Sequence, residues 1–167
     1  MDQGITISPA TTGDAAAISA ILAANHDDPG LFQKSPEAVV QAIEDFFVAR
    51  NGAGEMVGCA GLHRESLTLA EVYAVAVIPK CQGQGIGRQL VSRCERRATE
   101  DGIRDVWLAT IKPEYFSRYG FRTISRWELP APVLLRKLTQ VFEQPSGRWM
   151  GALFGRHTFM RLAVARS

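Results

Sequence analysis

The stretch VYAVAVIPKCQGQGIGRQLVSRCERR, residues 72–97, decides how this chain folds. It begins with strand-forming residues, and Pro79 ends that run. Glycines then stand at alternate positions, Gly83, Gly85 and Gly87, and a helical pattern follows. Glycine at a junction between a strand and a helix costs conformational entropy. We therefore expect a ligand to approach the backbone closely at this junction.

The helix after the glycines is expected over residues 85–101, with one apolar face. The free N–H groups at a helix start, together with the helix dipole, bind anions. We therefore predict a pyrophosphate cradle in this turn. A P-loop needs Lys and then Ser or Thr after its last glycine, but Arg88 and Gln89 follow Gly87 here. A Rossmann turn needs a third glycine at position 88, where this chain has Arg88. The predicted apolar face consists of Ile86, Leu90, Val91, Cys94 and Ala98.

The rest of the chain alternates between strand and helix patterns, without repeats or long linkers. The turn NGAGE, residues 51–55, joins two strands of a predicted antiparallel meander. This mixture predicts a single α+β domain over residues 1–167, with a mostly antiparallel sheet of about six to seven strands flanked by helices. Strands are expected over 5–10, 46–50, 56–63, 67–77, 104–111, 121–129 and 157–165, helices over 11–25 (capped by Asp14), 35–47, 85–101 and 133–144, and a helical turn over 113–120.

Composition excludes several classes of protein. The net charge is +2, from 19 basic and 17 acidic residues, which is too balanced to indicate nucleic-acid binding. The apolar runs are too short for a membrane span, and the first ten residues lack the pattern of a signal peptide. Cys59, Cys81 and Cys94 fit neither a disulfide framework nor a zinc site. We expect a cytoplasmic protein without a metal.

Two motifs resemble those of a known superfamily. VIPKCQGQGIGRQLV, residues 77–91, is similar to the acetyl-CoA-binding motif of the GNAT superfamily of N-acetyltransferases, and Gln82, Gly85 and Gly87 match its core. YFSRYGF, residues 115–121, resembles the second signature of that superfamily. The likeness extends over residues 5–128. A narrower resemblance, to the acetyltransferase domain of N-acetylglutamate synthases, adds WLATIKPEYFSRYGF and ELP, and implies a stand-alone domain of that type.

This resemblance implies acetyl-CoA as cosubstrate and places it on the chain. Its pantetheine arm is expected against the backbone at the end of the fourth strand. The strand before the glycine turn and the strand DVWLATI, residues 105–111, are expected to splay apart, because an amide-rich pantetheine can satisfy the backbone groups left unpaired. The implied contacts are Val75, Ala76 and Val77 for the pantetheine, and Gln82, Gly83, Gln84, Gly85, Ile86, Gly87 and Arg88 for the pyrophosphate.

Acetyl transfer to an amine requires a base, because an ammonium group cannot attack a thioester until it loses a proton. Glu71, in the apolar strand before the turn, is the candidate base, and His63 in the preceding strand is its rival. The thiolate that leaves requires an acid. Many relatives use a tyrosine at the position of Phe116, so the candidate here is the neighbouring Tyr115.

The narrower resemblance favours a small amino acid, with L-glutamate first, as the acceptor. Arginines in the last third of the chain are candidate partners for its carboxylates, or else form a solvated basic face. Alternative acceptors are a polyamine, an aminoglycoside or a protein N-terminus, and a CoA-binding sensor without turnover is a different class of function. Residues 133–155 are expected to shape the acceptor pocket or the face of a homodimer. The arginines are Arg118, Arg122, Arg126, Arg136, Arg148, Arg156 and Arg161.

Overall fold

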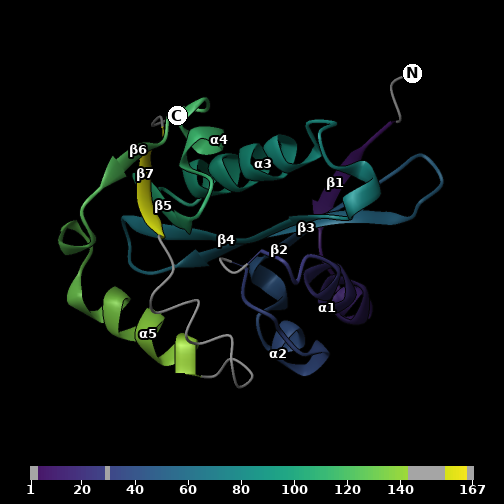
Figure 1. Ribbon diagram of the computed structural model, residues 1–167, viewed down its shortest axis with the longest axis horizontal. Coiled ribbons are helices and arrows are strands. Elements are labelled where there is room, and N and C mark those ends of the chain that lie inside the picture. The colour runs from purple at the N-terminus through teal and green to yellow at the C-terminus, as the bar shows by residue number, and fades with distance from the viewer. Residues whose placement is uncertain (1–3, 29–30, 143–156, 165–167) are drawn as a thin grey trace.

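A seven-stranded sheet runs through the molecule, with helices on both of its faces (Figure 1). The computed structural model describes residues 4–28, 31–142 and 157–164. The strands are β1 (Thr6–Pro9), β2 (Phe46–Arg50), β3 (Met56–Arg64), β4 (Leu69–Val77), β5 (Asp105–Thr110), β6 (Arg122–Ile124) and β7 (Thr158–Ala163). The helices are α1 (Ala15–Ala24), α2 (Pro36–Gln41), α3 (Ile86–Glu100), α4 (Pro113–Ser117) and α5 (Ala131–Phe142).

The strand order is β1-β2-β3-β4-β5-β7-β6, and every neighbouring pair is antiparallel except β4 and β5. The parallel pair is joined through α3, because parallel neighbours need a crossover rather than a tight turn. The predicted α+β class, with a mixed and mostly antiparallel sheet, is therefore confirmed.

The central strands β4 and β5 separate along their length. Their ladder joins Leu69–Glu71 to Asp105–Trp107. Beyond it, β4 continues to Val77 and β5 to Thr110. The splayed strands that the resemblance implied are thus present, and the gap between them opens toward the glycine turn.

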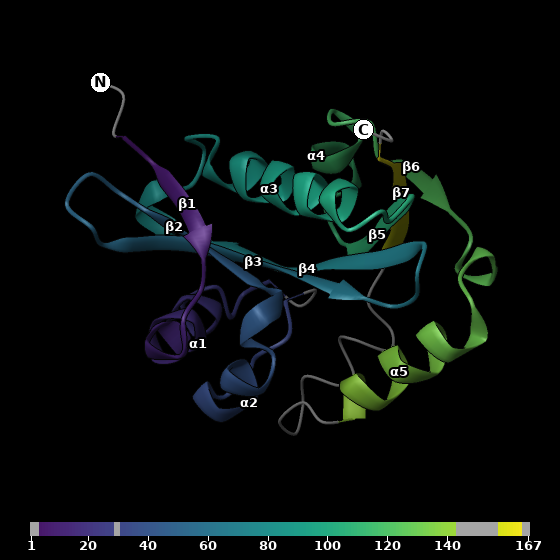
Figure 2. The same ribbon diagram turned by 180° about the vertical axis from the view of Figure 1, so that it is seen from behind.

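The two faces of the sheet carry different helices. Figures 1 and 2 show α3 and α4 on one face, and α1, α2 and α5 on the other. The predicted apolar face of α3 is confirmed, since Ile86, Leu90, Val91, Cys94 and Ala98 are all buried. On the opposite face, Ile18, Ile21 and Leu22 of α1 pack with Phe46 and Val48 of β2. The strands alternate between these two cores, as the period of two in a strand requires.

Several predicted boundaries were wrong. Helix α2 ends at Gln41 and a 3-10 turn, Ile43–Asp45, follows, because Phe46 already pairs with Gly61 at the start of β2. Strand β6 ends at Ile124 instead of residue 129. Ser125 and Glu128 form a capping box there, and the backbone N–H of Ser125 donates to Glu128 Oε1 at 2.9 Å, which starts another 3-10 turn.

Asp14 does not cap α1 through its side chain, contrary to the prediction. Its Oδ2 instead accepts from the backbone N–H of Thr11 at 2.9 Å, and its Oδ1 lies 2.5 Å from Arg50 Nη2. Burial raises the pKa of Asp14, but the hydrogen bonds from Thr11 and the pairing with Arg50 outweigh it, so the pKa lies below its ordinary value. The residue fastens the entry of α1 to β2.

Candidate active site

A cleft of about 550 Å³ lies where β4 and β5 separate. The two strands form its walls, the glycine turn lies at one end, and α4 closes one side. Val75, Ala76 and Val77, the residues predicted to meet the pantetheine, line this cleft. They follow the point where β4 leaves its ladder with β5, so this part of β4 is not paired with β5.

A bulge in β4 turns its backbone into the cleft. Ala74 has φ 51°, in the left-handed region that residues with a Cβ rarely adopt. The pairing of β3 with β4 shifts register nearby, between Cys59 and Gly61. Strained, bulged backbone of this kind clusters at functional sites. Ala74, at the bulge, lines the cleft.

The glycine turn owes its shape to backbone conformation. Gly83 and Gly85 both have φ 77°, and no neighbouring atom lies within 4 Å of a Cβ placed on either. Gly85 is the N-cap of α3, and the first N–H groups of that helix are free to bind an anion. Of the predicted pyrophosphate contacts, Gln82, Gly83, Gly85, Ile86 and Gly87 line the cleft, whereas Gln84 and Arg88 lie outside its lining.

The side chains of Gln82 and Arg88 have partners within the protein. Gln82 Nε2 donates to Asn25 Oδ1 at 2.9 Å and to the carbonyl of Val77 at 3.1 Å. Asn25 Nδ2 also donates to that carbonyl, at 3.2 Å, and so joins the end of α1 to the end of β4. Arg88 pairs with Glu95 at 2.8 Å. Asn25 lines the cleft and was missed from the sequence, because 52 residues separate it from its partner on β4.

Tyr115, the candidate acid, stands on α4 beside the start of α3. A Cβ on Gly87 would lie 3.0 Å from its hydroxyl oxygen. Burial and the neighbouring Tyr119 raise the pKa of Tyr115, so the phenol stays protonated at neutral pH. Phe116, at the position of the tyrosine in many relatives, is buried and packs edge-on against Phe121, with 5.9 Å between ring centroids.

A second cavity, of about 140 Å³, adjoins the cleft on the face of the sheet that carries α5. The two cavities share Val72, Tyr73, Ala74 and Ala109, so they meet at the bulge of β4. The remaining wall of the smaller cavity comes from Phe32, Lys34, Glu71, Lys137, Gln140, His157 and Phe159.

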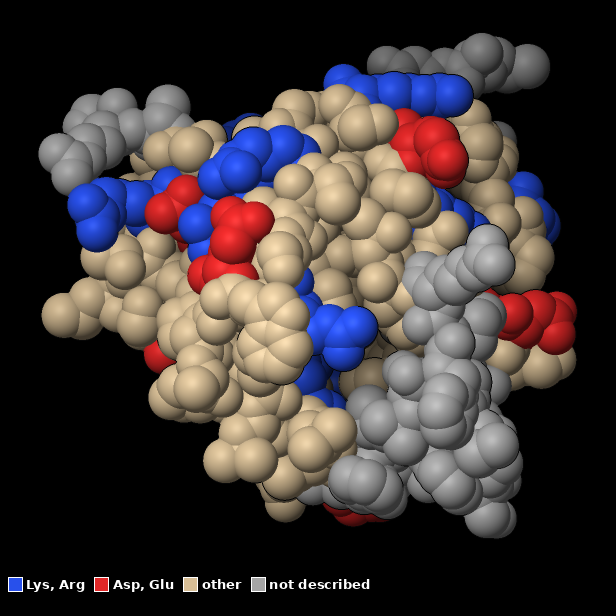
Figure 3. Space-filling view, turned by 60° about the vertical axis from the view of Figure 1, so that its left-hand side comes forward, with Lys and Arg blue, Asp and Glu red and all other residues tan. Residues whose placement is uncertain are grey.

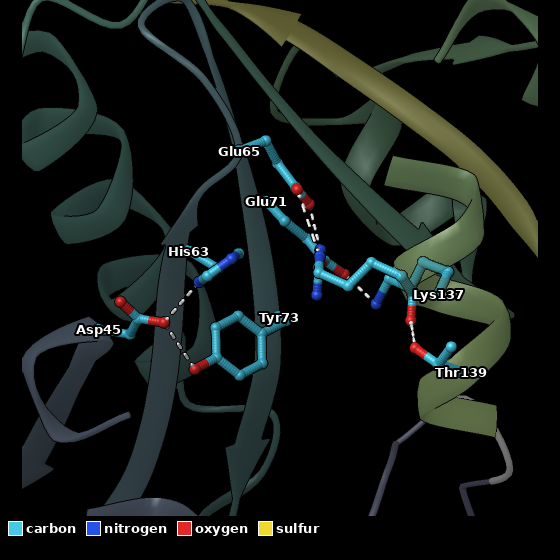
Figure 4. Close-up of polar contacts among 8 residues, drawn as sticks. Asp45, His63, Glu65, Glu71, Tyr73, Lys137 and Thr139 are labelled. Atoms are coloured by element: carbon cyan, nitrogen blue, oxygen red, sulfur yellow. Dashed lines mark hydrogen bonds and ion pairs between the residues drawn. The ribbon is translucent and has the colours of Figure 1, made fainter. Parts of the chain in front are cut away.

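Glu71, the candidate base, lies in the wall of this smaller cavity and is 2% exposed. Figure 4 shows its carboxylate directed toward α5. Oε2 accepts from Arg136 Nη2 at 2.6 Å, and Oε1 pairs with Lys137 Nζ. Both oxygens are therefore engaged by cations. The catalytic role of Glu71 stays a prediction.

His63, the rival base, lies opposite Glu71 in the ladder of β3 and β4 but outside the lining of both cavities. Its Nδ1 lies 3.0 Å from Asp45 Oδ2, which also accepts from the Tyr73 hydroxyl at 3.1 Å (Figure 4). The hydrogen bond with Asp45 raises the pKa of His63, although burial opposes it. The arrangement holds Tyr73 in the wall that the two cavities share.

Among the described residues, the arginines in the last third of the chain do not gather at one place. Arg136 pairs beside the smaller cavity, Arg118 lines the cleft, and Arg161 donates to the carbonyl of Glu128. Arg148, Arg156 and most of the predicted dimer segment lie outside the described residues. On the face seen in Figure 3, basic and acidic side chains are interspersed.

The cations in the wall of the smaller cavity are lysines, which the sequence analysis missed. Lys137 follows Arg136 on α5, and Lys34 precedes α2. Helical spacing could have indicated Lys137, because Val133, Arg136, Lys137 and Gln140 lie on one face of a helix. Nothing local to Lys34 indicated its place.

Two further findings concern metals and membranes. The described residues include no group of three or more His, Cys, Asp or Glu side chains placed to hold a metal ion. Within the same part of the chain, no helix combines the length and apolar character that a membrane crossing requires.

Comparison with known proteins places this site in context. A model of the acetyltransferase (GNAT) domain matches residues 42–123. An uncharacterised N-acetyltransferase of Chlorobaculum tepidum is 32% identical over 124 residues, which cover 74% of this chain and 79% of that protein. An amino-acid acetyltransferase of Mycobacterium tuberculosis is 33% identical over 105 residues, which cover 62% of this chain and 60% of that protein.

Solved structures share the fold. A Mycobacterium tuberculosis protein in complex with CoA superimposes with a TM-score of 0.79 at 25% identity, covering 96% of this chain and 99% of that one. The N-acetylglutamate synthase of Neisseria gonorrhoeae, complexed with CoA and N-acetyl-glutamate, has a TM-score of 0.82 at 23% identity. That match covers 99% of this chain but 36% of the synthase.

Proposed function

Because the chain belongs to the GNAT family of acetyltransferases, we propose that it transfers the acetyl group of acetyl-CoA to the amino group of a small amino acid that carries a carboxylate. L-glutamate is the first candidate. One observation carries this proposal: a small cavity with lysines in its wall adjoins the cleft at the bulge of β4. Relatives named amino-acid acetyltransferase support the same class of acceptor.

The cleft supplies the surroundings that the acyl donor needs. Val75, Ala76 and Val77 offer backbone groups to the pantetheine amides, and the first N–H groups of α3 face the pyrophosphate. The bulge at Ala74 presents backbone beside the reacting end, where an N–H group can polarise the thioester carbonyl. These roles rest on backbone, so they depend on the conformation of the chain more than on side-chain identity.

The charge around the smaller cavity favours an anionic acceptor. Lys34 and Lys137 line this cavity together with one carboxylate, that of Glu71. A polyamine or an aminoglycoside would add cations to a positive site. A protein N-terminus would bring a chain to a cavity of about 140 Å³. A small amino acid suits both the charge and the size.

The reaction requires two proton transfers, and each is assigned to a different group. Glu71 takes the proton of the ammonium group, and Tyr115 or a water protonates the sulfur that leaves. His63 lies outside the cavity lining and is assigned the positioning of Tyr73 through Asp45. The pairing of both Glu71 oxygens favours one second candidate function, a CoA-binding sensor without turnover, because a fully paired carboxylate is not free to act as a base.

Release of CoA thiol from acetyl-CoA tests the proposal. The acceptors are L-glutamate, other amino acids, a polyamine, an aminoglycoside and a peptide, with an acceptor-free blank for the thiols of the protein. We expect saturable release with an amino acid that carries a carboxylate. Release with the polyamine alone would contradict the proposed acceptor.

A variant separates the enzyme from the sensor. Glu71→Gln should lower the turnover number on the order of 10²–10⁴-fold, the usual contribution of a general base, while acetyl-CoA binding measured by calorimetry is retained. Binding of acetyl-CoA without release for any acceptor would favour the sensor.

A further inference from the structure

The charged groups around the smaller cavity are arranged so that one ion pair can be exchanged for another. Glu71 Oε1 and Lys137 Nζ pair directly, and both side chains line the cavity. We propose that a carboxylate of the acceptor takes Lys137 away from Glu71, and that the released oxygen of Glu71 accepts the proton of the acceptor's ammonium group. This inference rests on the proposed function and states how the same site selects its acceptor.

Arg136 keeps the other oxygen of Glu71 in place during the exchange. Its Nη2 donates to Glu71 Oε2 at 2.6 Å, and its Nε donates to Glu65 Oε2 at 3.2 Å while Nη2 also contacts Glu65 Oε1. The side chains of Glu65 and Glu71 are 6% and 2% exposed, so both carboxylates are shielded from water, whereas the Arg136 side chain is 26% exposed. A guanidinium held by two carboxylates is rigid. Arg136 is therefore a positioning residue for Glu71.

Lys137 is suited to change partners. Its Nζ lies 5.5 Å from the ring centroid of Phe32 and 5.5 Å from that of Trp107, which is within cation–π range. A lysine ammonium is a point charge on a flexible stem, so it can turn toward a new anion while it remains over these rings. After the exchange, Lys137 pairs with the carboxylate of the acceptor, and Glu71 remains paired with Arg136. No buried charge is left unpaired, which would be costly.

The position of the cavity links this exchange to the reaction. An amino acid whose carboxylate pairs with Lys137 lies against the wall that contains Glu71, beside the shared boundary at Tyr73 and Ala74. One proton passes from the ammonium nitrogen to Glu71 Oε1, and the nitrogen lone pair attacks the thioester carbon. The C–N bond forms, the C–S bond breaks, and the second nitrogen proton ends on sulfur. Glu71 then returns its proton to water.

This arrangement predicts selectivity in turnover as well as in binding. An amine without a carboxylate offers Lys137 no new partner, so Glu71 stays engaged and the amine stays protonated. The turnover number of the wild-type enzyme should therefore be higher for L-glutamate than for n-butylamine at saturation. A general base contributes on the order of 10²–10⁴-fold, which bounds the difference.

Lys137→Met tests the exchange, because it removes the ammonium and keeps an unbranched apolar stem. With Glu71 Oε1 released permanently, kcat/KM for n-butylamine should rise about tenfold above the wild-type value, part of the usual contribution of a base. The KM for L-glutamate should rise. The gain with n-butylamine should vanish in Glu71→Gln/Lys137→Met. Leu138→Met, at an exposed neighbouring position on α5, is the matched control and should behave as wild type.

The outcomes separate the two proposals. A higher KM for L-glutamate with an unchanged n-butylamine rate would mean that Lys137 only binds the carboxylate, and the exchange would be wrong while the proposed function stood. If wild type binds acetyl-CoA but acetylates no amine that carries a carboxylate, the proposed function fails and the exchange fails with it. Circular dichroism and thermal melting check that each variant folds. Lys137→Gln provides the same comparison if Lys137→Met does not fold.

Discussion

Replacement of Gly61 by alanine should disturb the wall that the two cavities share. Gly61 lies opposite Tyr73 in the ladder of β3 and β4. A Cβ on Gly61 would lie 2.5 Å from Tyr73 Cε1 and 2.6 Å from Cζ, so the ring passes flat over the glycine. The ring has little room to move, because Phe46 packs edge-on against it at 5.4 Å and its hydroxyl donates to Asp45.

The size of the effect follows from these contacts. An ordinary van der Waals contact requires about 3.4 Å or more, so the ring must shift by roughly 1 Å, and overpacking of this kind costs about 1–3 kcal/mol. Loss of the hydrogen bond from Tyr73 to the Asp45 carboxylate adds about 1.5 kcal/mol. Lower entropy of the unfolded chain offsets about 0.5–1 kcal/mol. We expect Gly61→Ala to lower the free energy of unfolding by about 1.5–4 kcal/mol.

Urea unfolding followed by circular dichroism measures this loss as a lower midpoint at constant slope. A double-mutant cycle assigns it to the ring, since Gly61→Ala should cost little in a Tyr73→Ala background. Gly52→Ala is the control, because no atom lies within 4 Å of a Cβ at that glycine. The reasoning is refuted if Gly61→Ala resembles Gly52→Ala, or if its cost is the same with and without the Tyr73 ring.

Two further predictions concern titration and thiol reactivity. Because Asp45 raises the pKa of His63 above 6.5, this pair stabilises the fold below about pH 6.5 and the contribution is lost as pH rises through the raised pKa. Urea unfolding between about pH 6 and pH 8 should show this decline, and Asp45→Asn should flatten it. Burial raises the pKa of Cys59 and of Cys94 to about 12, so an alkylating reagent should label Cys81 first in the native protein. Acetyl-CoA should slow that labelling, because Cys81 lines the cleft, and equal labelling with and without it would contradict the assignment.

Local sequence determined the part of the molecule that handles the acyl donor. The glycines after β4 and the apolar face of α3 predicted the turn and the helix, the resemblance to the GNAT superfamily implied the splayed strands, and the GNAT family assignment is confirmed. These features depend on neighbours along the chain. A left-handed glycine and a helical period of 3.6 residues are visible within one short window, because their causes are steric and local.

Tertiary structure alone decided the surroundings of Glu71. Glu71 was named from its strand, but its pairing with Arg136 and Lys137 joins β4 to a helix more than 60 residues later, as the 65-residue separation of Glu71 and Arg136 shows. Likewise, Asp45 reaches His63 across 18 residues. No local pattern specifies such contacts, because they arise from which strands pair and from how α5 packs on the sheet. Burial of the hydrophobic faces fixes where those elements lie, and so determines which distant charges become partners.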